Sequence, residues 1–156
     1  MKIATKEIII LEEKFTLTNQ RAAFWAEEKA LIFSDLHIGK TAHFRKNGIA
    51  LASHIMKNDL DRLSILIELF KPEQLIIVGD LLHAGNNSDV DEFCKWKEQY
   101  SNLQFKLIEG NHDRISKNLD KKLKLDFKAE ISTIRNISFV HDFDKKNKSF
   151  QITGHI

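Results

Sequence analysis

The chain has 156 residues, of which 42% are hydrophobic and 29% charged, and this length and composition are typical of one soluble globular domain with its own core. The formal net charge of +2 excludes a strong overall field that would attract nucleic acid or an acidic membrane. Cys94 is the single cysteine, which excludes an internal disulfide framework, and the first residues lack the apolar core of a signal peptide, so we expect a cytoplasmic protein.

The first third of the chain predicts strands that lead into a polar loop. Strands are expected over residues 7–17, 21–25 and 29–34, and the first two are expected to form a hairpin at the sheet edge. Residues 36–49 follow as a loop that gathers positive charge.

The clearest helix covers residues 53–70, where apolar side chains recur at helical spacing and Pro72 follows. Beyond it, strands and helices alternate, and then short strands follow in series. This order predicts a mixed sheet first and an antiparallel portion later, as two packed sheets with helices outside. The later elements are expected at 75–78 (strand), 89–100 (helix capped by Ser88), 103–108 (strand), 115–122 (short helix or irregular segment), 123–134 (two short strands), 138–141 (strand) and 149–154 (strand).

Residues 75–78 form an unbroken apolar run, which indicates a strand buried on both faces. The run ends at Gly79 and Asp80, so a carboxylate lies at the carboxyl end of a strand, where open α/β sheets bind their ligands. By itself this pattern also describes an ordinary turn. Five strand ends in succession nevertheless deliver Asp, His or Asn, and this repetition predicts a shared site. The side chains concerned are Asp35, His37, Asp80, Asn111, His112, His141 and His155.

These side chains suit hard or borderline divalent metals, namely Mn²⁺, Fe²⁺, Zn²⁺ or Mg²⁺. Two adjacent metals bridged by one carboxylate bind a phosphate and promote displacement at phosphorus. Asp80 is the expected bridge, because it lies between the other ligand groups along the chain. His112 follows Asn111 and is expected to protonate the leaving oxygen of the substrate. Asp113 is expected to orient His112, and a surface turn acid is the alternative.

Basic residues near these ligands are candidates for contacts with substrate phosphate. Lys40 and Arg45 lie just past Asp35 and His37, and a guanidinium can bind two phosphate oxygens at once. The alternative is a solvated basic loop. A later lysine-rich segment is either a second phosphate track or a solvated face. Its members are Lys117, Lys121, Lys122, Lys124 and Lys128.

Together these motifs resemble the calcineurin-like metallophosphoesterases, in the order that this family has, over most of the chain. A closer resemblance, to the bacterial DNA-ligase-associated metallophosphoesterases linked to endonuclease activity in DNA repair, rests on residues 37–40, 44–45, 48–49 and 79–83. The motifs that carry the family resemblance are Asp35-x-His37, Gly79-Asp80, Gly110-Asn111-His112-Asp113, His141 and Gly154-His155.

The resemblance implies a four-layer αββα sandwich of the metallophosphoesterase type, in one domain over residues 1–156, with two divalent metals, foremost Mn²⁺. It implies that His112 is the catalytic histidine and that His83 is a second residue on the substrate side. A phosphodiester substrate in DNA or RNA is implied too, with DNA ligase and helicase as repair partners. The implied metal ligands are Asp35 and His37 for the first ion, Asp80 as the bridge, and Asn111, His141 and His155 for the second.

One motif departs from the family pattern. The family has Gly-His-x-His, whereas this sequence stops one residue after His155. We therefore expect a chain truncated at its C-terminus, with the first metal site one ligand short and its activity reduced.

Three functions remain open at this stage. The first is a metal-dependent phosphodiesterase acting on nucleic acid in DNA repair. The second is a phosphatase or phosphodiesterase for a small nucleotide, which would respond little to salt. The third is a non-catalytic docking module in a repair complex, which the incomplete last motif favours and the intact ligand set opposes.

Overall fold

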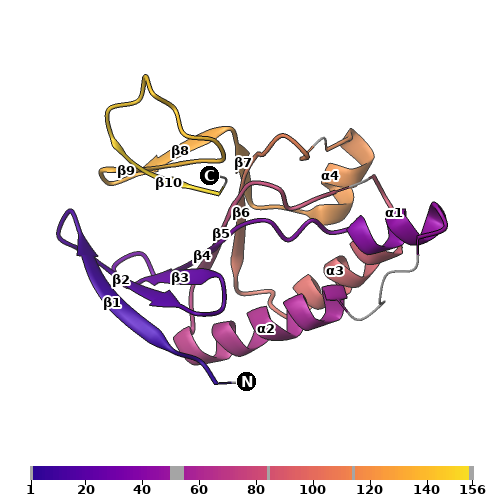
Figure 1. The fold of residues 1–156 in the computed structure, drawn as a ribbon, viewed down its shortest axis with the longest axis horizontal. Helices are drawn as coiled ribbons and strands as arrows, with labels where there is room; N and C mark the ends of the chain where they lie inside the picture. The colour runs from indigo at the N-terminus through magenta and orange to yellow at the C-terminus, as the bar shows by residue number, and fades with distance from the viewer. Residues whose placement is uncertain (1, 50–54, 84, 114, 155–156) are drawn as a thin grey trace.

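Two β-sheets and four helices make up the described part of the chain, residues 2–49, 55–83, 85–113 and 115–154 of a computed structural model (Figure 1). In chain order the elements are β1 (Thr5–Ile10), β2 (Glu13–Thr18), β3 (Ala22–Trp25), β4 (Ala30–Phe33), α1 (Lys40–Lys46), α2 (Ile55–Phe70), β5 (Gln74–Val78), α3 (Ser88–Glu98), β6 (Gln104–Ile108), α4 (Lys117–Leu123), β7 (Phe127–Ala129), β8 (Ile131–Ile134), β9 (Ile137–Val140) and β10 (Phe150–Thr153).

The large sheet has the strand order β1-β2-β3-β4-β5-β6-β7. The neighbouring strands from β1 to β4 pair antiparallel, and those from β4 to β7 pair parallel. Every residue of β4 and of β5 is buried, as expected for central strands covered on both faces. Because the central strands are parallel, their carboxyl ends meet at one edge of the sheet.

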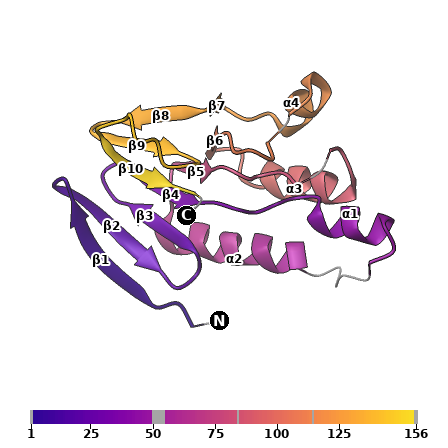
Figure 2. The ribbon, with the colours of Figure 1, turned by 45° about the horizontal axis from the view of Figure 1, so that its top comes forward.

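The large sheet lies between the helices α2 and α3 on one face and the small sheet β10-β9-β8 on the other (Figures 1 and 2). Side chains of β5 alternate between the two layers: Leu75 and Ile77 pack with the helices, whereas Ile76 and Val78 pack against Phe139 of the small sheet. The buried apolar side chains of α2, α3 and α4 all lie in the helical cluster. These layers agree with the expected metallophosphoesterase fold. They are three of the four expected layers, because within the described ranges no helix covers the outer face of the small sheet.

Two predicted strand arrangements were wrong. Residues 7–17 form two strands, because the chain reverses at Leu11 and Glu12, both in the left-handed region at φ 49° and 67°. No glycine marks this turn in the sequence. In the small sheet, β10 is parallel to β9, so the later portion is not purely antiparallel. The connection between them returns to the starting end of β9, which strand propensity alone does not specify.

One predicted loop and one predicted helix cap also need correction. Residues 36–49, expected as a loop, contain α1, which begins after Gly39 at φ 93°. Asn87, rather than Ser88, caps α3, since its side-chain oxygen accepts hydrogen bonds from the backbone N–H groups of Asp89 and Val90. Helix α2 begins at Ile55, and residues 53 and 54 of the prediction lie outside the described part of the chain.

None of the helices in the described ranges has the length and apolar character needed to cross a membrane.

The layer between the two sheets generates a stability prediction. Ile76 is 1% exposed there, so Ile76→Ala leaves a cavity and should lower the free energy of unfolding by about 2–5 kcal/mol. Ile65 of α2 is 41% exposed, and the control Ile65→Ala should change it by less than about 0.5 kcal/mol. Urea unfolding of both variants measures the difference, and equal losses would contradict the assigned layer.

Candidate metal centre

Polar side chains from four strand ends meet at one edge of the large sheet. Asp35 follows β4, Asp80 follows β5, Asn111 follows β6, and His141 follows β9 of the small sheet. The first two loops run side by side, because the backbone N–H of residue 35 donates to the carbonyl of Gly79 at 3.2 Å. A parallel bridge between residues 38 and 82 continues this pairing. The strand ends therefore hold the ligand candidates through backbone hydrogen bonds.

Asp35, His37 and Asp80 form one compact donor group. Each offers a ligand atom, and these atoms all lie within 4.8 Å of one another. His37 Nε2 lies 3.7 Å from Asp35 Oδ1 and 3.7 Å from Asp80 Oδ2. All three residues have positive φ, at 57°, 45° and 51°, a strained conformation for a residue with a side chain and one that clusters at functional sites. Two carboxylates and an imidazole at this spacing fit a divalent metal.

The Asp80 carboxylate lies between two histidines from different loops. Its Oδ2 faces His37, and its Oδ1 lies 3.5 Å from Nε2 of His141. The same Oδ1 also accepts a hydrogen bond from the backbone N–H of His112 at 3.3 Å. Asp80 and His141 are both buried. Each carboxylate oxygen is thus directed to a different group of ligand candidates.

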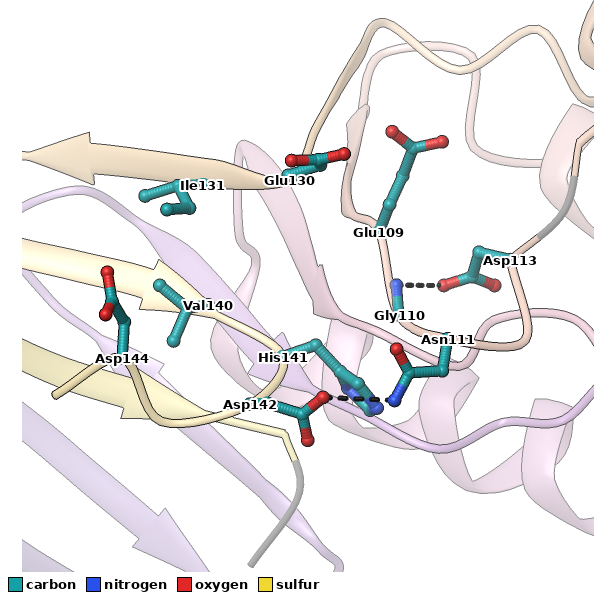
Figure 3. Close-up of a pocket in the computed structure, with 10 residues that line it drawn as sticks. All are labelled: Glu109, Gly110, Asn111, Asp113, Glu130, Ile131, Val140, His141, Asp142 and Asp144. Atoms are coloured by element: carbon teal, nitrogen blue, oxygen red, sulfur yellow. Dashed lines mark hydrogen bonds between the residues drawn. The ribbon is translucent and has the colours of Figure 1, made fainter. Parts of the chain in front are cut away.

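The second group of candidates borders a cavity of about 410 Å³ (Figure 3). Asn111 Nδ2 donates to Asp142 Oδ2 at 3.0 Å, which leaves the amide oxygen of Asn111 as its ligand atom. His141 lies beside Asn111 in the same wall. The other acidic side chains that line this cavity, besides Asp113 and Asp142, are Glu109, Glu130 and Asp144.

Two glycines allow the close approach of these ligands. A Cβ at Gly79 would lie 2.0 Å from Nδ1 of His141, and a Cβ at Gly110 would lie 2.5 Å from Oδ1 of Asp80. Gly79 also has φ 79°, which a larger residue rarely adopts. Both glycines are therefore required by the space that the ligand side chains occupy.

The Asp113 side chain accepts hydrogen bonds from the backbone of two site loops. Its two carboxylate oxygens accept hydrogen bonds from the backbone N–H groups of Leu82, at 2.9 Å, and Gly110, at 2.8 Å. Burial raises the pKa of this carboxyl, and the two backbone hydrogen bonds act in the opposite direction. The alternative of a surface turn acid is wrong, because Asp113 is 5% exposed, whereas the orientation of His112 by Asp113 stays a prediction. Its contacts join the second loop to the third.

Histidine rings crowd the outer side of the centre. His112 is exposed, and its ring centroid lies 5.7 Å from that of His37 and 6.0 Å from that of His83, which it stacks on. Burial lowers the pKa of His83, and the positive charges of His37, Lys40 and two further histidines lower it as well. These effects favour the neutral form of the His83 ring, which lies beside His112.

The expected phosphate-binding residues have different surroundings. Lys40 is exposed at the start of α1 and lines a cavity of about 440 Å³ together with Asp35 and His37. Arg45 instead forms an ion pair with the buried Asp89, in which Nη2 lies 3.7 Å from Oδ1. This carboxylate partly neutralises the positive charge of Arg45. In the lysine-rich segment two members are in ion pairs, Lys122 with Asp91 and Lys128 with Asp120, as in a solvated face.

Sequence reasoning missed several supporting residues. Ser34 Oγ donates to Asp35 Oδ2 at 2.8 Å, and Asp142 holds the Asn111 amide. Asp89 accepts a hydrogen bond from the backbone N–H of Ala42 at 2.9 Å and so fastens α1. Ser34 and Asp142 could have been found because each is next to a predicted ligand in the sequence, whereas no sequence pattern pointed to Asp89. His155, the last expected ligand, lies outside the described residues.

Comparisons with known proteins agree with this geometry. The family model for calcineurin-like phosphoesterases matches residues 29–154. Among solved structures, the chain is similar to the nuclease MPE of Pseudomonas putida, with 26% sequence identity and a TM-score of 0.81 over 95% of this chain and 71% of that chain. No curated protein matches the chain.

The buried Asp113 contacts generate a second prediction. Asp113→Ala leaves the N–H groups of Leu82 and Gly110 unsatisfied, so it should lower the free energy of unfolding by about 1–3 kcal/mol or more. Asp61 is exposed on α2, and the control Asp61→Ala should stay within about 0.5 kcal/mol of wild type. Urea unfolding compares the two, and a small change in both would show that the loops do not depend on this carboxylate.

Proposed function

Because the chain belongs to the calcineurin-like phosphoesterase family, which hydrolyses phosphoesters, we propose that it is a phosphodiesterase that uses two divalent metals and acts on nucleic acid. The observation that carries this proposal is the position of Asp80. Its two oxygens face two different histidines, with Oδ2 3.7 Å from His37 Nε2 and Oδ1 3.5 Å from His141 Nε2. A carboxylate placed in this way is suited to bridge two ions.

The donor set fits the metals that this proposal requires. Asp35 and His37 would hold one ion, Asn111 and His141 would hold the other, and Asp80 would be shared. His37 Nε2 already faces both carboxylates of its group. Oxygen and imidazole ligands favour Mn²⁺, Fe²⁺, Zn²⁺ or Mg²⁺, and we propose Mn²⁺. When bound, such a pair binds phosphate and acidifies water.

His112 is the proposed proton donor to the leaving oxygen. Its backbone N–H is held by Asp80, while its side chain is exposed at the mouth of the centre. The His83 ring stacks on the His112 ring, with 6.0 Å between the two centroids. His112 thus has a fixed backbone and a ring open to substrate, as a group that donates a proton to substrate requires.

Nucleic acid is the proposed substrate for two reasons. The similar solved structure is that of a nuclease, and Lys40 lies exposed beside the first metal ligands. The proposed endonuclease role in DNA repair, with DNA ligase and helicase as partners, rests on the motifs at residues 37–40, 44–45, 48–49 and 79–83. The proposed cytoplasmic location rests on the single cysteine and on the missing apolar core of a signal peptide.

The metal requirement is tested by hydrolysis of bis-p-nitrophenyl phosphate. Metal-stripped protein should be inactive and should regain activity on titration with Mn²⁺. His112→Ala should lower kcat by about 10²–10⁴-fold, because the leaving oxygen loses its proton donor. Asp80→Asn should abolish the response to Mn²⁺, and the control Asp61→Asn on α2 should match wild type. Hydrolysis by protein from which the metal has been chelated, or a wild-type rate in Asp80→Asn, would contradict the proposal. The absence of hydrolysis by the wild-type protein with Mn²⁺ would favour a docking role.

Salt dependence separates nucleic acid from a small nucleotide. The KM for a single-stranded DNA oligonucleotide should rise steeply with NaCl, with a logarithmic slope of about 0.7 for each phosphate contacted, whereas the KM for a cyclic mononucleotide should change little. Lys40→Gln should reduce the slope for DNA, and Lys57→Gln on α2 serves as the control of equal charge change. An equally shallow response for both substrates would support the small-nucleotide alternative.

A further inference from the structure

We propose that Phe44, on helix α1, is a stacking platform for the nucleobase next to the scissile phosphate. The inference rests on the proposed phosphodiesterase function and names the part of the substrate that lies outside the metal centre. It assigns a binding role to a residue that has no part in the chemistry of hydrolysis.

A continuous series of rings leads from the metal ligands to Phe44. His37 contacts His112 edge-on, His112 stacks on His83 at 6.0 Å, and His83 stacks on Phe44 at 5.9 Å. Both stacked pairs have interplanar angles of 22°. His43, beside Phe44, meets the His83 ring at 5.7 Å and 66°. The series of rings therefore begins at the reacting group and ends on α1, where Phe44 is its last member.

Helix α1 is fastened in place, so the Phe44 ring has a defined position relative to His83. The backbone N–H of Ala42 donates to Oδ2 of the buried Asp89 at 2.9 Å. Nδ2 of Asn87, the residue that caps α3, donates to the carbonyl of Gly39 at 3.3 Å. A Cβ at Gly39 would lie 2.7 Å from that same nitrogen. Both contacts that fasten the start of α1 are thus made by residues at the start of α3.

The chemistry of Phe44 indicates what it binds. The ring has no group that can ligate a metal or move a proton, yet it is only half-buried at the edge of a strongly polar centre. Its neighbours on α1 supply cations for phosphate, chiefly the exposed Lys40 and Lys46. An aromatic face beside cations is the pattern that binds single bases with their backbone, because every base offers a π-face. The phosphate would lie near His112 and the base against Phe44.

A simpler role for Phe44 is to support the His83 ring, and the test separates the two. Two substrates with the same leaving group are used, thymidine 5′-p-nitrophenyl phosphate and methyl p-nitrophenyl phosphate. With Mn²⁺-loaded protein, Phe44→Leu should lower kcat/KM for the thymidine diester by about 5- to 20-fold, because base–aromatic stacking is lost, and should leave the methyl diester within about twofold. Phe44→Tyr should retain both activities, and Phe127→Leu, at the start of β7, is the matched control. Equal losses on both substrates would overturn the proposal in favour of support for His83.

A second readout is independent of hydrolysis. Fluorescence of a short oligonucleotide that contains 2-aminopurine should be quenched by wild type and by Phe44→Trp in the presence of EDTA, and much less by Phe44→Leu or Phe44→Met. Quenching without hydrolysis would mean that the proposed function fails while the platform stands. Hydrolysis of both diesters without quenching would overturn the platform and leave the function intact. Two aliphatic variants are used so that the misfolding of one does not remove the comparison.

Discussion

The Asp80 carboxylate is the point on which the arrangement of the centre depends. It belongs to the strand end of β5, in the middle of the large sheet, and its oxygens face one histidine from the β4 loop and one from the small sheet. This buried charge needs partners on both sides, because an isolated carboxylate in a protein interior is costly. The two sheets are thus joined by their apolar layer and also by the polar ligands at its edge.

Strain and space constrain the same residues. Asp35, His37 and Asp80 adopt positive φ, and the loops that carry them hold each other through backbone hydrogen bonds. Asp113 adds two hydrogen bonds that tie the second loop to the third. Gly110 leaves room for the carboxylate that it faces. These contacts offset the cost of the strained backbone and hold the loops that carry the ligand candidates.

Charge is distributed unevenly around the centre. On the side of Asn111 and His141, the cavity is lined by several carboxylates. On the side of α1, exposed lysines and aromatic rings predominate, and the charge of Arg45 is shared with Asp89. Under the proposed function, this asymmetry would direct a polyanionic substrate along α1 and away from the acidic cavity. The overall charge of +2 conceals this asymmetry.

The sequence by itself determined the central strands and the residues that end them, because burial of an apolar run and the residue after it are local properties. Asp35, Asp80 and Asn111 were found in this way, as was most of helix α2. Only the tertiary structure decided the parallel pairing of β10 with β9, the helix within residues 36–49, and the acceptors that Asp113 provides. These depend on which groups meet across long separations in the chain. A local sequence pattern cannot predict these contacts, because the groups that form them are brought together only in the folded chain.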